Sequence, residues 1–154
     1  MIIVEDTRQQ AGKHETKPAA WIAAGDLIIR SKLPFGDYAL PPAVAIDTKA
    51  NMAEIAHNIG GPKSEHARFR DELKAAKAAG TRLYILIENA EGIRSIDDVA
   101  RWKNPRRTIS PRAINGPQLS KAMRTISDRY GAVFRFCAPE EAPDVIKDIL
   151  TNGQ

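Results

Sequence analysis

Two aspartates and a lysine in the first third of the chain could bind a metal ion and act on a phosphate group. Asp37 follows a glycine at a predicted turn, Asp47 ends an apolar segment at residues 44–46, and Lys49 comes two residues later. Residues two apart on a strand point to the same face, so Asp47 and Lys49 should project together, within reach of Asp37. Two carboxylates beside an ammonium group suit Mg²⁺ or Mn²⁺, which prefer oxygen ligands. The alternative is a strand end that simply meets solvent, because an acid–x–lysine pair alone is a weak signal.

A basic stretch between residues 101 and 129 is a separate candidate for contact with nucleic acid. It carries eight lysines and arginines against one acid, Asp128, which gives a local charge of +7. Residues 104–117 are predicted to form a loop, and a basic loop can hold a phosphate backbone. Trp102 could stack on an unpaired base if it is exposed; the alternative is a solvated surface with Trp102 packed into the core. The predicted contacts are Arg101, Trp102, Lys103, Arg106, Arg107 and Arg112.

The composition fits an ordinary folded domain. The chain has 154 residues, 43% of them hydrophobic and 27% charged, which is too apolar for a disordered chain. The single cysteine, Cys137, excludes an internal disulfide and fits a reducing compartment. No apolar run approaches the roughly 18 residues of a membrane span, and charges follow Met1 too soon for a signal peptide. The net charge of +4 permits a polyanionic partner. We expect a cytoplasmic or nucleoid-associated protein without membrane contact.

Strands and helices in alternation would position these side chains. Residues 10–18 are expected to be loop, and the three strands between residues 27 and 46 to form a meander. The order of the elements predicts an α/β fold, a central mixed β-sheet flanked by helices. The predicted strands are 2–4, 27–33, 38–40, 44–49, 83–87 and 132–136, and the predicted helices are 52–59, 64–79, 95–102, 117–130 and 139–150.

In order along the chain, five short motifs resemble the nuclease domain of the XPF-type structure-specific endonucleases. These excision-repair and flap or junction nucleases lie within the PD-(D/E)xK, restriction-endonuclease-like superfamily. The family pattern runs Val-Asp-x-Arg-Glu, Gly-Asp-Tyr, Glu-Arg-Lys, Gly-Arg-x-x-x-Gln on a helix, and a strand ending Leu-Ile-Glu. The resemblance covers residues 2–90; beyond them only the order of the elements agrees. The matching positions are Asp6 and Arg8; Gly36, Asp37 and Tyr38; Asp47 and Lys49; Arg68; and Leu86, Ile87 and Glu88.

The resemblance implies a restriction-endonuclease-like fold and metal-dependent cleavage of DNA, at branched, flap or junction sites. By this likeness, Asp37 and Asp47 hold Mg²⁺ or Mn²⁺, and Asp6 supports the metal directly or through water. Lys49 positions the attacking water or stabilises the transition state. The remaining matches, Arg8 and Arg68, would contact phosphate or brace the acids.

The resemblance also implies a domain organisation and an oligomeric state. Residues 1–154 would form a single nuclease domain, without the family's helix-hairpin-helix domain appended. Nuclease domains of this family pair through their carboxy-terminal elements, so the apolar side of the last predicted helix could form a homodimer; the alternative is packing on its own sheet.

The departures from the family pattern leave other functions open. Gln9 stands where the family has a glutamate, and Thr48 where it has an arginine, whose role Arg30 or Arg68 could take over. The family also has an acid four residues after the lysine, at position 53 here. In this sequence the acid is one place later, at Glu54, and its alternative role is to cap the helix. Such drift fits a remote member, phage-borne or bacterial. It fits equally a catalytically inactive DNA-binding or protein-interaction module. A restriction-type or RNA-directed nuclease on the same fold is a third possibility.

Overall fold

A six-stranded mixed sheet forms the centre of the molecule, with strand order β2-β1-β3-β4-β5-β6. The computed structural model describes residues 1–10, 15–40 and 43–153. β3 is antiparallel to both of its neighbours, while the pairs β1–β2, β4–β5 and β5–β6 are parallel. The strands are β1 (Ile2–Asp6), β2 (Leu27–Ser31), β3 (Tyr38–Leu40), β4 (Val44–Lys49), β5 (Arg82–Glu88) and β6 (Val133–Cys137).

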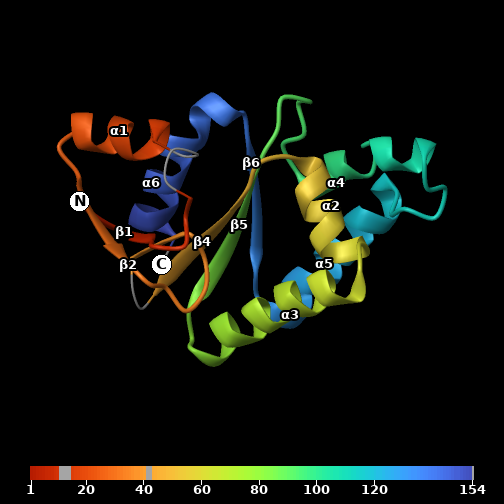
Figure 1. Cartoon of the computed structure of the whole chain (residues 1–154), viewed down its shortest axis with the longest axis horizontal. Helices are drawn as coiled ribbons and strands as arrows, with labels where there is room; N and C mark the ends of the chain where they lie inside the picture. Colours follow the sequence, from red (N-terminus) through yellow and green to blue (C-terminus); the bar gives the residue numbers. More distant parts are fainter. Residues whose placement is uncertain (11–14, 41–42, 154) are drawn as a thin grey trace.

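Helices cover both faces of this sheet, which makes the fold a three-layer α/β arrangement (Figure 1). α1 (Thr16–Ala23) and α6 (Ala142–Asn152) lie side by side on one face, and α2 (Met52–Gly60), α3 (Lys63–Ala78) and α5 (Gly116–Tyr130) lie on the other. Each face has its own hydrophobic core. The predicted α/β class, a central mixed sheet flanked by helices, is confirmed. The short elements are α4 (Ile96–Val99), η1 (Pro105–Thr108) and η2 (Pro139–Glu141).

The direction of the strands gathers several strand ends at one edge of the sheet. Because β3 runs opposite to β1 and β4, the carboxyl ends of β1, β4 and β5 lie at the same edge as the amino end of β3. β5 is apolar on both sides because both faces of the sheet are covered there. Ligand sites of open α/β sheets form at such an edge, where the strands end and the helices begin.

The amino-terminal part of the chain differs from the prediction. α1 begins at Thr16, inside the predicted loop at residues 10–18, and continues through residues for which no element was predicted; residues 11–14 of that loop lie outside the described residues. The predicted meander is wrong, because β1 lies between β2 and β3. Parallel pairing of β1 with β2 requires a crossover, and α1 supplies it. Trp21 holds α1 in place: it is buried, stacks edge-on against Tyr38, and its Nε1 donates to Pro143 O.

The remaining strands and the longer helices follow the predicted ones closely, but the helix predicted at residues 95–102 spans only Ile96–Val99, and η1 lies within the predicted loop at residues 104–117. Asn51 caps α2 by accepting from Glu54 N, and Glu54 accepts in return from Ala50 N, so the capping role proposed for Glu54 is confirmed. Across the described residues, no helix combines the length and apolarity needed to cross a bilayer.

Candidate active site

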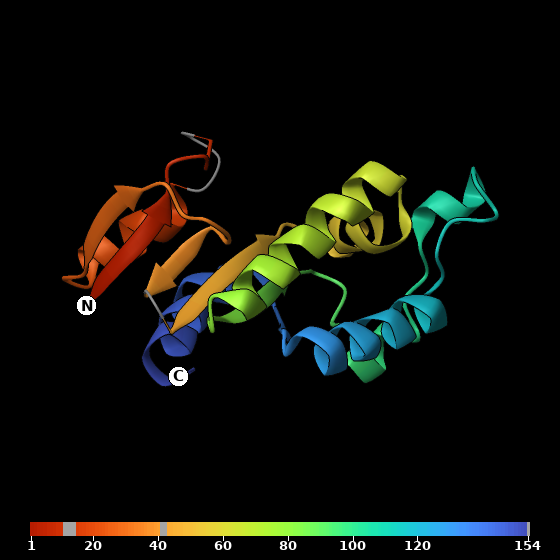
Figure 2. The ribbon, with the colours of Figure 1, turned by 90° about the horizontal axis from the view of Figure 1, so that it is seen from below.

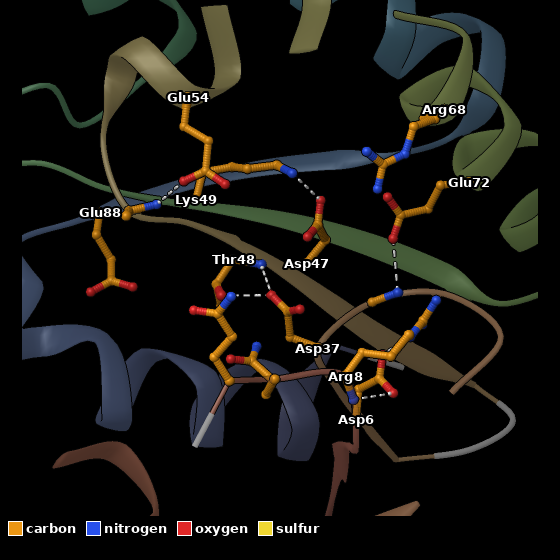
Figure 3. A pocket seen from close by; sticks show the side chains of 14 residues that line it. Asp6, Arg8, Asp37, Asp47, Thr48, Lys49, Glu54, Arg68, Glu72 and Glu88 are labelled. Atoms are coloured by element: carbon orange, nitrogen blue, oxygen red, sulfur yellow. Dashed lines mark hydrogen bonds and ion pairs between the residues drawn. The ribbon is translucent and has the colours of Figure 1, made fainter. Parts of the chain in front are cut away.

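The edge where the strands end opens into a cavity of about 410 Å³ that is rich in acidic side chains (Figure 3). β1, β4 and β5, the turn before β3, and helices α2 and α3 all contribute to its wall. Six carboxylates line it against three cations, although the chain as a whole is basic. These charged residues are Asp6, Asp37, Asp47, Glu54, Glu72 and Glu88, with Arg8, Lys49 and Arg68.

Asp47 and Lys49 meet as the two-residue spacing predicts. Lys49 Nζ lies 2.8 Å from Asp47 Oδ2, and both side chains are largely buried. Asp47 Oδ2 accepts no hydrogen bond of good geometry from the described residues, so the ion pair with Lys49 is its main compensation. Lys49 Nζ also lies 5.6 Å from the centre of the Phe69 ring, which packs under it from α3.

The charge on Asp47 is poorly stabilised by the protein alone. Burial raises the pKa of Asp47 well above its ordinary value, and the nearby Glu72 and Asp37 add to the effect, although Lys49 opposes it. Burial would lower the pKa of Lys49, but Asp47 outweighs it and the net shift is upward, so Lys49 is a protonated donor. A bound cation would stabilise the Asp47 carboxylate in a way that these neighbours do not.

Asp37 is presented to the same cavity by a tight turn. Gly36 has φ +74°, and a Cβ there would come 3.0 Å from Ile46 O, so the turn needs glycine. Asp37 N donates to Ile46 O at 2.7 Å, and Asp37 Oδ2 accepts from both N and Oγ1 of Thr48, each at 2.7 Å. The threonine that replaces the family's arginine therefore holds Asp37 in place. Sequence reasoning missed this role.

Asp6 lines the same cavity as Asp37 and Asp47, but protein donors engage both of its carboxylate oxygens, and its role in supporting a metal stays a prediction. Its Oδ2 pairs with Arg8 Nε at 2.5 Å, its Oδ1 accepts from Leu33 N, and Arg8 Nη2 donates to Leu33 O at 2.7 Å. Asp6 and Arg8 thus tie β1 to the segment after β2. Within residues 1–10, 15–40 and 43–153, no group of three or more His, Cys, Asp or Glu side chains stands at metal-binding spacing.

The other side chains of the cavity are held by partners far away in the chain. Glu72 on α3 accepts from Gly36 N at 2.8 Å, which fixes the Asp37 turn against the helix. Glu88 at the end of β5 pairs with Lys17 of α1 at 2.5 Å. Lys17 is 71 residues from Glu88 in sequence, and nothing in the local sequence pattern signals this pair.

Arg68 lines the cavity, and Arg30 does not. The Arg68 guanidinium is largely exposed and pairs with Glu65 at 3.3 Å, one turn earlier on α3. Arg30 on β2 pairs with Glu5 at 3.2 Å, outside the cavity wall. Thr48 stands where the motif has an arginine, and Arg30 and Arg68 were the two candidates to take the place of that arginine. Of these two, only Arg68 is placed to reach a ligand in the cavity.

The basic stretch lies beyond α2, and its tryptophan is not on the surface. Trp102 is only 7% exposed and packs in the core beneath α5, so stacking of this residue on a base is ruled out. Gly116, the first residue of α5, comes close to the backbone of residues 99–102, where a Cβ would fall 2.6 Å from Trp102 O. Arg101 pairs with Asp98, and Arg107 donates to Ala113 O, while Lys103, Arg106 and Arg112 are exposed.

Fold and site together give an α/β domain with an acidic cavity at one edge of its mixed sheet. Among solved structures, XPF from Aeropyrum pernix superposes with a TM-score of 0.68 at 17% identity, over 99% of this chain and 65% of the other. A complex of that protein with DNA superposes equally well, at 16% identity over 64% of its chain. This chain thus spans slightly less than two thirds of the XPF chains. The predicted XPF-like nuclease fold is confirmed. No protein-family model and no curated protein matches the sequence.

Proposed function

We propose that the protein is a metal-dependent DNA endonuclease. The observation that carries this proposal is the convergence of Asp37, Asp47 and Lys49 in one acidic cavity, on a fold shared with XPF. One of the similar XPF structures is bound to DNA, which supports DNA as the substrate. Branched, flap or junction DNA is the substrate class we expect from the motif resemblance.

The residues of the cavity fit a divalent cation. Asp47 Oδ2 is buried without a hydrogen-bond donor of good geometry, and Asp37 Oδ1 is not used in the bonds to Thr48. Asp37 and Asp47 would therefore hold Mg²⁺ or Mn²⁺, which accept one or two carboxylates and keep their remaining sites for water and phosphate. Such an ion, when bound, lowers the pKa of water and stabilises charge on a phosphate.

Lys49 supplies positive charge to the reacting phosphate. Its ammonium has three donors and stays protonated, because Asp47 raises its pKa. It can therefore donate to a phosphate oxygen as negative charge grows there, but it does not accept a proton from water. Arg68, exposed on α3 at the wall of the cavity, can reach a second phosphate oxygen.

A cleavage assay tests this function. Labelled flap, junction, nicked and duplex DNA, and matching RNA, would be incubated with Mg²⁺ or Mn²⁺ and the parent protein, Asp37→Asn or Asp47→Asn. We expect metal-dependent cutting of DNA that falls roughly 10²-fold or more in either variant. Thermal melts establish that the variants fold. Cutting at the parental rate by both folded variants would overturn the assignment.

A second candidate is a DNA-binding module without catalysis. It is favoured because each of the three predicted acids already has a protein partner: Asp6 and Asp47 form ion pairs with Arg8 and Lys49, and Asp37 accepts from Thr48. This alternative predicts DNA binding without cleavage of any substrate in either metal. The same panel of substrates separates the two functions.

A further inference from the structure

A second groove, of about 360 Å³, lies between α2 and the loop at residues 104–114. Its charged and ionisable lining consists of Arg106, Arg112 and His57, and no carboxylate contributes to its wall. The groove is basic and the cavity is acidic, although residues from the first turns of α2 line both of them. Ala53 lines the groove while Glu54 lines the acidic cavity. The two hollows therefore meet at the same turn of α2.

The loop that forms this groove is braced from within. Asn104 accepts from Arg106 N at 3.0 Å and donates to Ile114 O at 2.8 Å, which closes the base of the loop. Arg107 Nη1 donates to Ala113 O at 2.7 Å across it. The end of α2 approaches closely, since a Cβ on Gly60 would fall 2.7 Å from Ile114 Cβ. The groove is thus a built feature, and it needs glycine at position 60.

The positive charge of the groove has no acidic counterpart. The sequence carries no Asp or Glu between residues 99 and 127. Arg101 and Arg124, outside the groove, pair with Asp98 and Asp97. The Arg106 guanidinium contacts the His57 ring, at 3.4 Å, and neither Arg106 nor Arg112 has an ion pair with any residue that the structure describes. Uncompensated arginines that face one hollow are suited to bind phosphate.

The tip of the same loop exposes an apolar side chain. Ile109 is 88% exposed, the most exposed large hydrophobic residue in the described part of the chain. It lies between Arg107 and Arg112 in the sequence, and the loop projects from the body of the molecule on the side away from α1 (Figures 1 and 2). Single exposed apolar residues are common, but one at the tip of a basic loop can pack against a base where stacking is already interrupted.

We propose that this groove binds the backbone phosphates of a DNA strand next to the bond held in the acidic cavity, with Arg106 and Arg112 on the phosphates and Ile109 against an unstacked base. The proposal rests on the proposed function for the choice of DNA. In this proposal the acidic cavity binds the divalent cation, and the groove binds the phosphates of the adjacent strand. The shared turns of α2 set the path of the strand between them.

Binding of labelled flap DNA in EDTA, measured by fluorescence anisotropy at several salt concentrations, tests the groove without any cleavage. Arg106→Ala/Arg112→Ala should lower the affinity on the order of tenfold or more, and should reduce the salt slope by about 2, because each lost phosphate contact removes about one unit. The single variant Arg112→Ala is compared with Arg135→Ala, which removes an exposed arginine of β6 that lies outside the groove. An affinity and slope equal to those of Arg135→Ala would overturn the proposal.

Ile109→Ser separates the apolar contact from the charge. Because Ile109 is exposed, the variant should melt like the parent, bind flap DNA more weakly, and keep the parental salt slope and affinity for plain duplex. Unchanged binding to both DNAs would overturn the role of Ile109. Displacement of DNA by polyglutamate as readily as by unlabelled DNA would assign the groove to an acidic protein partner and overturn the choice of DNA.

The cleavage and binding assays together show whether the proposed DNA-binding groove or the proposed nuclease activity has failed. A parent protein that cuts no substrate, with binding still lost in Arg106→Ala/Arg112→Ala, refutes catalysis and leaves the groove supported. Metal-dependent cutting with unaltered DNA affinity in the groove variant refutes the groove alone.

Discussion

The ion pair between Lys17 and Glu88 should contribute strongly to stability, and Lys17→Met tests this. Lys17 Nζ lies 2.5 Å from Glu88 Oε2, with side chains only 6% and 12% exposed. Removing one partner of a buried pair typically costs about 3–5 kcal/mol, because it leaves an uncompensated charge. Glu88 borders the open cavity, where water can reach it, so we expect the lower end, about 3 kcal/mol.

Thermal unfolding followed by circular dichroism measures this loss. For a chain of this size, about 3 kcal/mol corresponds to a Tm lower by roughly 6–12 °C. Lys17→Met/Glu88→Gln removes both charges and should recover most of the stability, because no isolated charge remains buried. Lys74→Met, on the exposed side of α3, is the control and should leave Tm almost unchanged. If Lys17→Met lowers Tm by less than about 2 °C, or if the double variant is no more stable than the single one, the ion pair does not contribute strongly to stability.

Two further predictions concern other parts of the fold. Lys147 and the terminal amine of Met1 hold the pKa of Asp26 below its ordinary value, so its stabilising effect is present above the unfolded pKa of about 4 and is lost as pH falls through the lower folded pKa. Urea unfolding should therefore show Asp26→Asn to be less stable than the parent at pH 7, with a difference that shrinks below about pH 4; a constant difference would contradict this. Gly36→Ala should destabilise the protein by more than about 1 kcal/mol, because position 36 has a positive φ and a Cβ there would crowd Ile46 O, and it should displace Asp37. A variant with the stability and the cleavage rate of the parent would contradict the requirement for glycine in this turn.

The sequence was sufficient to predict the central part of the site. A spacing of two on a buried strand places Asp47 beside Lys49, and the turn at Gly36 brings Asp37 to the neighbouring strand end. Both results depend on local geometry, which sequence patterns encode. The apolar strands and capped helices were predictable for the same reason.

Contacts between distant segments were not predictable in this way. The Lys17–Glu88 pair joins residues far apart, and α1 is stabilised by the packing of Trp21 against α6 more than by its own sequence. Trp102 lies in a basic stretch yet is buried, because it packs in the same core as Leu119 and Met123 of α5. These features arise from tertiary packing, which a spacing of residue types does not determine.

The central claim is that Asp37 and Asp47 together bind a divalent cation, and the most direct test is Mn²⁺ binding measured by electron paramagnetic resonance. We expect one bound Mn²⁺ per parent chain, lost in Asp37→Asn and in Asp47→Asn and retained in Asp26→Asn, whose carboxylate lies outside the cavity. Equal binding by the parent and both cavity variants, or no binding by the parent in the presence of DNA, would contradict it.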